Sequence, residues 1–482
     1  MLFNSTDFLI FLPVVFIIYW FILNKSLNIQ NLFVAAASYL FYGWWDWRFL
    51  SLIGISTIID YSVGRGLAKA HSQKTRKGLL LTSLGVNLGL LGFFKYFNFF
   101  VDSFITAFSF LGFQLNPTSL NLILPVGISF YTFQTLSYTI DVYKGKLQPT
   151  NNLVAFAAFV SFFPQLVAGP IERASNLLPQ FQKKRHFNYL ESVNGLKQIL
   201  WGMFKKIVIA DRCAEIANLA FRNPSEHSGS ALIIGVVLFS FQIYGDFSGY
   251  SDIAIGTARL FGFRLMKNFA YPYFSRDIAE FWRRWHISLT TWFRDYLYIP
   301  LGGSRVGTRK KIRNIFIVFL TSGFWHGANW TFLVWGAIHA LFYLPLQIFD
   351  KHRENIQVVA KGKIIPSLKE AFNMLSTFAL AAFAWIFFRA ENIGHAFSYI
   401  ENMLSRSIFS RPDLPNRQLL ITAVLLLFFL LLEWLGREND YAIEKLGVKG
   451  PQIVRWGFYA LLIFLIGMFM QSEETPFIYF QF

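Results

Sequence analysis

The chain has 482 residues, of which 54% are hydrophobic, 19% aromatic and only 15% charged. Soluble domains carry roughly 25% charged residues, so this composition excludes an ordinary soluble protein and predicts an all-α polytopic membrane protein. The net charge of +17 does not indicate nucleic-acid binding, because no basic module rich in aromatic residues lies outside the apolar segments. Basic loops that face an anionic lipid bilayer explain the charge instead.

Twelve apolar segments predict about twelve transmembrane helices, since one crossing needs roughly 20 residues. They cover residues 7–24, 29–46, 49–66, 78–101, 119–140, 195–221, 229–258, 314–331, 332–349, 370–389, 418–435 and 452–471. Loops rich in Lys and Arg alternate with loops that carry few. The positive-inside rule places the basic loops in the cytosol and both termini outside. The basic loops are residues 69–77, 182–187, 305–313 and 350–363.

Two segments do not fit simple spans. Residues 151–181 are apolar but contain Pro164, Gly169, Pro170 and Pro179. Broken backbone at membrane depth is tolerated only inside protein or beside a water-filled cavity, so we expect a re-entrant segment.

Residues 264–303 form the second unusual segment, and we expect cytosolic interfacial helices there. Within it, the stretch "FWRRWHISLTTWF" (281–293) predicts one interfacial or re-entrant helix with an aromatic stripe on one face and two arginines on the other. The stripe comprises Trp282, Trp285, His286 and Leu289, and the opposite face carries Arg283 and Arg284.

An ionisable imidazole, His326, lies in an uncharged run of residues 314–349. The run is too long for one span, so we expect two helices that turn near residues 327–329. A hydrogen-bonded packing histidine is one interpretation of His326. Ionisable residues inside membranes more often mark a site, which favours a functional role. His286 is a second candidate, whereas for His339 we prefer the packing interpretation.

Two carboxylates, Asp246 and Asp252, lie in the apolar span 229–258. They either hold a basic side chain or helix end, or they belong to a site. We also take Trp285 and Asn329 as candidate substrate-binding residues, because they lie beside the two histidines in sequence. We expect no metal site and no bound cofactor.

Four blocks carry a resemblance: "FFPQLVAGPIERA" (162–174), "YGDFSGYSDIAIGTARLFGF" (244–263), "FWRRWHISLTTWFRDYLYIPLGG" (281–303) and "GFWHGANWTFLVWG" (323–336). They resemble the membrane-bound O-acyltransferase family. The similarity is greatest to its bacterial branch of alginate O-acetylases, peptidoglycan O-acetyltransferases and teichoic-acid D-alanyl transferases. The resemblance implies a single membrane domain, residues 1–482, with helices around a central funnel or tunnel. It also implies that His326 is catalytic and that His286 is its partner on the cytosolic side.

The chemistry of the residues agrees with this resemblance. Acyl transfer needs a base to take a proton from a hydroxyl, and imidazole suits that work near neutral pH. The donor is expected to be acetyl-CoA or an acyl-carrier thioester from the cytosol. Arg283, Arg284 and Arg294 are candidates for binding the donor's phosphates, with lipid headgroups as the alternative.

The chain ends "TPFIYFQF", within a tail (472–482) that we expect outside the membrane. Interfacial anchoring by aromatic residues is one interpretation. The ending also resembles a terminus of bacterial family members, which implies that Tyr479 relays the acyl group outward.

The resemblance further implies an extracytoplasmic partner, an acyltransferase or esterase-like protein that would modify a cell-surface polysaccharide. The alginate-like exopolysaccharides and peptidoglycan are the expected acceptors, and the bacterial cytoplasmic membrane is the expected location. The alternatives are D-alanyl transfer to teichoic acid, or a transporter or flippase of the envelope.

Overall fold

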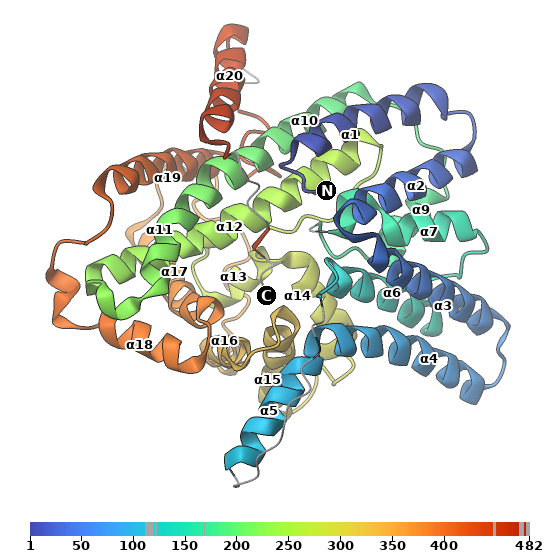
Figure 1. Cartoon of the computed structure of the whole chain (residues 1–482), viewed down its shortest axis with the longest axis horizontal. Coiled ribbons are helices and arrows are strands. Elements are labelled where there is room, and N and C mark those ends of the chain that lie inside the picture. Colours follow the sequence, from blue (N-terminus) through green and yellow to red (C-terminus); the bar gives the residue numbers. More distant parts are fainter. Residues whose placement is uncertain (111–119, 121–122, 168, 447–449, 472–476, 479–482) are drawn as a thin grey trace. The chain divides into compact units, whose positions relative to one another are not determined.

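The computed structural model describes residues 1–110, 120, 123–167, 169–446, 450–471 and 477–478. Every regular element in these ranges is a helix, which confirms the all-α prediction. The chain divides into two units: residues 1–192 with 257–266, and residues 193–256 with 267–482. We call them unit 1 and unit 2 and describe each by itself (Figure 1).

Unit 1 contains the N-terminal helices. α3, α4 and α6 pack against one another, and α2 packs against α7 and α8. The elements are α1 (Thr6–Ile17), η1 (Ile18–Ile22), α2 (Leu27–Asp46), η2 (Trp47–Phe49), α3 (Leu50–Lys69), α4 (Gln73–Leu91), η3 (Gly92–Tyr96), α5 (Phe97–Phe110), α6 (Ile128–Tyr143), α7 (Leu153–Ser161), α8 (Phe163–Leu166), α9 (Ala174–Phe181) and the start of α10 (Tyr189–Met203).

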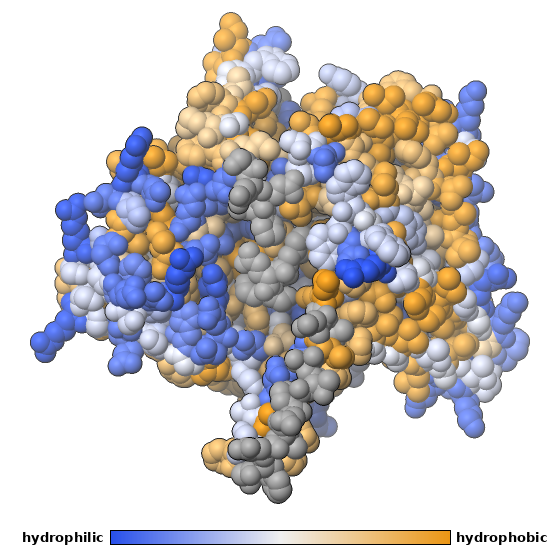
Figure 2. All heavy atoms as spheres, viewed as in Figure 1, coloured by the Kyte–Doolittle hydropathy of each residue, from blue (hydrophilic) through white to orange (hydrophobic). Residues whose placement is uncertain are grey.

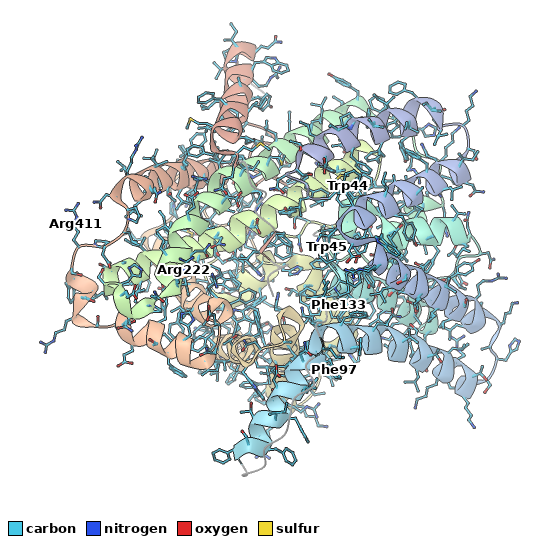
Figure 3. All side chains as sticks on the ribbon, viewed as in Figure 1. Trp44, Trp45, Phe97, Phe133, Arg222 and Arg411 are labelled. Atoms are coloured by element: carbon cyan, nitrogen blue, oxygen red, sulfur yellow. The ribbon has the colours of Figure 1, made fainter. Side chains whose placement is uncertain are left out.

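Large apolar side chains are exposed along the first helices of unit 1. Leu9 and Phe21 are each 72% exposed and Leu32 is 57% exposed. The surface over α1 and α2 is mainly orange in Figure 2. Tryptophans Trp44 and Trp45, labelled in Figure 3, lie near the end of α2. Apolar walls with tryptophan at a helix end are typical of a protein surface that meets lipid.

A polar cluster lies inside this apolar unit. Asp60 on α3 has no exposed surface. Its carboxylate accepts hydrogen bonds from the Ser83 hydroxyl, from Asn87 Nδ2 at 2.9 Å and from the Thr139 hydroxyl at 3.1 Å. The donors are all neutral and come from α4 and α6, so the cluster links the three helices.

Unit 2 contains the remaining helices. α15 and α16 form the tightest pair, α17 packs against α16, and α11 packs against α19. The elements are η4 (Phe204–Ala210), α11 (Asp211–Arg222), η5 (Pro224–Glu226), α12 (Gly229–Leu260), η6 (Pro272–Phe274), α13 (Ile278–Arg284), α14 (Ile287–Phe293), η7 (Arg294–Tyr298), α15 (Thr308–His326), α16 (Trp330–Ile348), α17 (Leu368–Arg389), α18 (Ile393–Met403), η8 (Arg406–Phe409), α19 (Asn416–Gly436) and α20 (Gln452–Phe469). Its basic side chains Arg222 and Arg411 are labelled in Figure 3.

Six helices in the described residues are long and apolar enough to cross a membrane. They are Gln73–Phe110, Gly229–Leu260, Trp330–Ile348, Leu368–Arg389, Asn416–Gly436 and Gln452–Phe469. The membrane class is therefore supported, while twelve crossings and a central funnel stay predictions. The two-helix prediction for 314–349 is confirmed, because α15 ends at His326 and α16 begins at Trp330.

The segment 151–181 is broken, as its sequence predicts. It forms three short helices, α7, α8 and α9, with interruptions at Phe162 and between Leu166 and Ala174. Pro164 lies in the first turn of α8, where its missing N–H costs nothing. This proline therefore starts a helix, and the breaks lie beside it.

Candidate active site

The turn after α15 places His326 at a helix end. The two helices of this hairpin, α15 and α16, approach closely because each has a glycine at the point of contact. A Cβ on Gly323 would lie 2.2 Å from the Phe332 carbonyl oxygen, and one on Gly336 would lie 2.4 Å from that of Phe319. Such small residues allow close helix contact within a membrane. Asn329 then caps α16, since its side chain accepts from Thr331 N–H at 3.0 Å.

His326 is 3% exposed and is surrounded by aromatic rings. Its ring lies edge-on to Trp325, Trp335 and Phe388, at centroid distances of 5.0, 5.1 and 5.3 Å. The His286 ring centroid lies 6.4 Å away. The structure thus brings together the two histidines that stand 40 positions apart in the sequence.

The single helix predicted over residues 281–293 is wrong. α13 ends at Arg284, and α14 begins at Ile287. His286 between them has a left-handed backbone, with φ of 42°. A left-handed non-glycine residue costs roughly 1–2 kcal/mol, so surrounding contacts must hold it. The predicted separation of faces holds only in part, because Trp285 and His286 are buried and Arg283 is exposed, but Arg284 is only partly exposed.

Asn268 supplies the contacts that hold this break. Its backbone carbonyl accepts from Ile287 N–H at 2.9 Å. Its Oδ1 lies 3.0 Å from His286 Nδ1 and accepts from the Ser288 hydroxyl at 2.8 Å. Burial lowers the pKa of His286 to about 3, so its imidazole is neutral at physiological pH.

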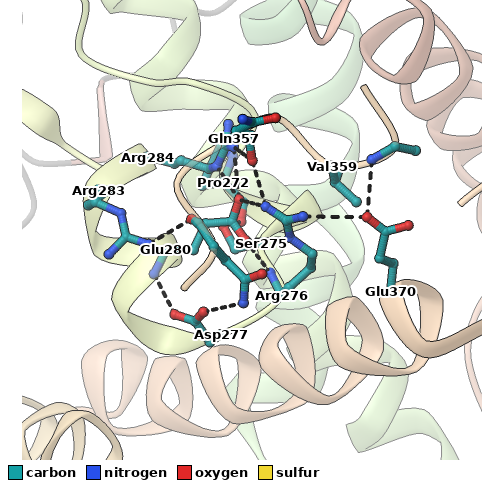
Figure 4. Close-up of polar contacts among 12 residues, drawn as sticks. Pro272, Ser275, Arg276, Asp277, Glu280, Arg283, Arg284, Gln357, Val359 and Glu370 are labelled. Atoms are coloured by element: carbon teal, nitrogen blue, oxygen red, sulfur yellow. Dashed lines mark hydrogen bonds and ion pairs between the residues drawn. The ribbon is translucent and has the colours of Figure 1, made fainter. Parts of the chain in front are cut away.

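The two arginines beside the break bind protein groups (Figure 4). Arg283 donates to the carbonyls of His352 at 2.6 Å and Asn355 at 2.8 Å. Arg284 forms an ion pair with buried Glu280, with Nη2 at 2.8 Å. Arg276 also pairs with Glu280, with Nε at 3.0 Å. Together these contacts fix the loop after α16 against α13.

A cavity of about 550 Å³ lies between α13, α14, α15 and the loop after α16. Its lining includes three arginines, Arg283, Arg294 and Arg353, and no carboxylate among the described residues. Apolar side chains such as Trp282 and Phe319 also line it. Ser322 borders the cavity one helical turn before His326, on the same face of α15. The cavity therefore combines positive charge with an apolar interior close to His326.

Asp246 and Asp252 each bind a lysine. Lys206 Nζ lies 2.7 Å from Asp246 and 2.8 Å from Asp211. Lys205 Nζ lies 2.6 Å from Asp252 and donates to Ser248 at 2.8 Å. We had not predicted these lysines, although charged residues inside the apolar span 195–221 carry the same signal that identified Asp246.

Glycines let α10, which leads directly into the two lysines, pack closely against α12. A Cβ on Gly202 would lie 2.6 Å from the Gly249 carbonyl oxygen, and one on Gly256 would lie 2.5 Å from that of Gly195. α10 and α12 therefore pack backbone to backbone. The next turn, η4, is a π-helix that carries both lysines inward.

The C-terminal segment reaches the same region. Phe477 has no exposed surface, and its ring lies 4.7 Å from Tyr250 and 5.6 Å from Phe247. The Ile478 N–H donates to Asp246 at 2.7 Å. Phe247 in turn lies edge-on to His286 at 4.6 Å. Tyr479 lies outside the described residues.

The remaining candidates, Trp285, Asn329 and His339, make contacts that pack or cap helices. Trp285 packs against Trp385 at 5.0 Å. Asn329 caps α16 and donates to the Glu391 carbonyl at 2.8 Å. His339 is buried among aromatic rings, 4.9 Å from both Trp282 and Trp335. Neither of its ring nitrogens has a hydrogen-bond partner among the described residues, and no cluster of metal-binding side chains occurs in that part of the chain.

The six long apolar helices indicate a polytopic membrane protein, and two buried histidines lie close together in unit 2. The chain belongs to the membrane-bound O-acyltransferase family, whose sequence profile matches residues 150–388. It is therefore a membrane acyltransferase, and the resemblance of its four sequence blocks is confirmed.

Relatives extend the similarity over the whole chain. A probable alginate O-acetylase of Pseudomonas putida is 37% identical over 508 residues, covering 100% of each chain. The peptidoglycan O-acetyltransferase of Helicobacter pylori is 36% identical over 433 residues, covering 84% of this chain and 80% of its own. The teichoic acid D-alanyltransferase of Bacillus subtilis is 28% identical over 289 residues, covering 57% and 71%.

Proposed function

We propose that this chain is an O-acetyltransferase that passes acetyl groups across the bacterial cytoplasmic membrane for O-acetylation of a cell-surface polysaccharide. The observation that carries the proposal is the pairing of His286 and His326, whose ring centroids lie 6.4 Å apart, beside a cavity lined by arginines. The two relatives similar over most of the chain are named for O-acetyl transfer. The D-alanyltransferase is similar over a smaller part, which makes that function the second candidate.

In this proposal the cavity receives the acyl donor. Arg283, Arg294 and Arg353 suit the phosphates of acetyl-CoA or of a carrier protein's phosphopantetheine. The apolar lining suits the thioester arm, and Ser322 marks the end nearest His326. Arg283 already binds two backbone carbonyls, so it would serve the donor while it holds the loop.

The transfer step needs a base at the acceptor hydroxyl. His326 takes the hydroxyl proton as the oxygen forms a bond to the thioester carbonyl carbon. The C–S bond breaks, and the leaving thiolate takes up the proton that His326 received, which returns His326 to its neutral form. The aromatic surroundings of His326 keep water from competing with the acceptor.

The position of the C-terminal segment supports Tyr479 as the first acceptor. Ile478, the residue before it, is bound by Asp246, and Phe477 packs against Phe247, whose ring in turn contacts His286. An extracytoplasmic partner would then move the acetyl group to the polysaccharide. This scheme includes twelve helices, a funnel open to the cytosol and both termini outside.

The proposal is tested with purified protein in lipid nanodiscs and acetyl-CoA labelled in the acetyl group. We expect release of coenzyme A thiol and label on the chain. His326→Ala should lower the rate by about 10³-fold, within the range of general base catalysis. His339→Ala is the matched control, because it truncates another buried histidine of the same aromatic cluster. Full activity of His326→Ala, or label that crosses the bilayer still bound to coenzyme A, would contradict the proposal.

Tyr479→Phe tests the relay separately. It removes one oxygen and keeps the ring, so anchoring survives while the nucleophile is lost. We expect no label on the C-terminal peptide by mass spectrometry after acid quenching. The double variant Tyr479→Phe/Phe480→Tyr moves the hydroxyl by one residue and should not restore labelling. Unchanged surface acetylation by Tyr479→Phe would leave the tail as an anchor only.

A further inference from the structure

We propose that Asn268 is a positioning residue, which holds His286 in the tautomer protonated on Nδ1 and so presents Nε2 as a hydrogen-bond acceptor to a substrate O–H or N–H. The inference rests on the proposed function, in which His286 acts beside His326. It concerns a residue between α12 and α13 that no sequence motif had singled out.

The hydrogen bonds of Asn268 fix which end of its amide faces His286. Its side chain is fully buried. Oδ1 accepts from the Ser288 hydroxyl at 2.8 Å and from Ser288 N–H at 3.4 Å. A backbone N–H can only donate, so an oxygen must occupy this position. The other end, Nδ2, donates to the Ser251 hydroxyl at 3.0 Å.

The orientation of the amide decides the tautomer of His286. Oδ1 lies 3.0 Å from Nδ1 and can only accept, so Nδ1 carries the proton. The Ser288 hydroxyl lies 3.5 Å from Nδ1, further than its 2.8 Å contact with Asn268, and its single proton goes to the shorter bond. Nε2 of the neutral ring therefore carries a lone pair.

That lone pair has no hydrogen-bond partner among the described residues. His286 is 1% exposed, so water does not replace a partner freely. An unpaired buried acceptor costs about 1–3 kcal/mol, and the strained backbone of His286 adds to this cost. His286, which lies beside His326, therefore combines an unpaired acceptor with a strained backbone. A substrate group that donates to Nε2 would complete the set of hydrogen bonds.

The charged groups near this assembly allow a clean test. Among the described residues, His326 is a titratable group whose ring contacts His286. On the far side of Asn268, a cavity of about 20 Å³ is lined by Lys205, Asp252 and Lys267 together with Glu433 and Asp440. Lys205 and Asp252 already form an ion pair. A carboxylate at position 268 would stay in the 3.0 Å contact with His286 Nδ1, and it would also act on these charged groups.

The experiment measures kcat and KM of the full-length protein in nanodiscs with acetyl-CoA between pH 5 and 9. Asn268→Asp keeps the acceptor but adds a negative charge, which raises the pKa of His286 and favours its protonated form. The pKa of His286 is about 3 in the parent, below the measured range, and we expect the carboxylate to raise it into that range, so that an acid limb appears and activity recovers at high pH. Asn268→Ala should lower kcat about 10–100-fold, as loss of an orienting partner does, with a smaller change in KM.

Ser251→Ala is the matched control, because it removes a hydrogen bond from the opposite end of Asn268 and leaves Oδ1 on His286. We expect its activity to stay within about threefold of the parent, since net hydrogen-bond contributions of this kind are about 1 kcal/mol or less. If Asn268→Asp lowers activity equally at every pH, Asn268 has only a structural role and the inference is overturned.

A second pair of variants decides the matter if Asn268→Asp does not fold. Glutamine places an amide oxygen near the Nε2 position and asparagine places one near Nδ1. His286→Gln should therefore be at least about tenfold more active than His286→Asn, a difference of about 1.4 kcal/mol. Equal activities would overturn the inference. Loss of activity in His326→Ala alongside either negative result would leave the proposed function standing, so the two failures are distinguishable.

Discussion

Asp60 in unit 1 and Asp246 in unit 2 are both buried carboxylates on apolar helices, but their partners differ. Asp60 is held by neutral groups of Ser83, Asn87 and Thr139. Asp246 is held by the charged Lys206 and by a backbone N–H of the C-terminal segment. Hydrogen bonds from neutral donors favour the ionised carboxylate less strongly than a neighbouring lysine does, and an ion pair loses its attraction when one member is neutral. The Asp60 cluster links three helices of unit 1. The Asp246 carboxylate instead joins Lys206 to the C-terminal segment.

The largest effect on stability is expected from Lys206→Met. The change leaves Asp246 and Asp211 buried without their shared cation. Breaking a buried ion pair from one side costs about 3–5 kcal/mol. The free energy of unfolding, measured by denaturant titration in detergent micelles, should fall by that amount. Stability equal to that of the parent would show that the lysine and the carboxylates do not depend on one another.

The same substitution at both carboxylates makes the comparison direct. Asp246→Asn keeps an acceptor for Ile478 N–H but removes the charge that faces Lys206, and we expect a loss of about 2 kcal/mol. Asp60→Asn keeps an acceptor among neutral donors and should cost less than about 1 kcal/mol. Thermal unfolding followed by tryptophan fluorescence ranks the two variants. The reverse order would mean that the Asp60 cluster depends on a negative charge.

A smaller effect is expected at His339, a buried side chain that packs among aromatic rings. His339→Phe fills a similar volume and removes two nitrogens that have no hydrogen-bond partner among the described residues. We expect a change in unfolding free energy between zero and about 1 kcal/mol, in the stabilising direction. Acetyl transfer should persist. Loss of transfer in a folded protein would assign His339 to the reaction and contradict the packing interpretation.

The smallest effect is expected at Asp413 in the loop before α19. Burial would raise the pKa of Asp413, but hydrogen bonds from Ser228 and His227 outweigh it and lower the pKa to about 2. A lowered carboxyl pKa stabilises the loop above the ordinary value near 4, and that stabilisation is lost as pH falls from about 4 to 2. Hydrogen exchange at Ser228 N–H should accelerate in this window. In Asp413→Asn the acceleration should be absent.

The sequence predicted features that depend on local composition. The break near residues 327–329 follows from an apolar run too long for one span, and the interrupted helices of 151–181 follow from proline and glycine. The left-handed turn at His286 could not be predicted, because periodicity continues through it and the contacts that hold it come from Asn268, 18 residues earlier. Charged residues in apolar spans were a usable signal. We applied it to Asp246 and Asp252 but not to Lys205, Lys206 or Asp60.

The number of residues in the π-helix η4 determines how α11 is oriented about its axis. Seven residues, Phe204–Ala210, form this wide turn between α10 and α11. A π-helical turn holds one residue more than the α-helical turn that would replace it. Inserting one further residue after Lys206 would exceed what the wide turn absorbs and would rotate α11 by about 100° about its axis, the angle of one α-helical residue. Asp211, the first residue of α11, would turn away from Lys206 although every charged side chain is still present. An insertion here would therefore be as damaging as the loss of a charge.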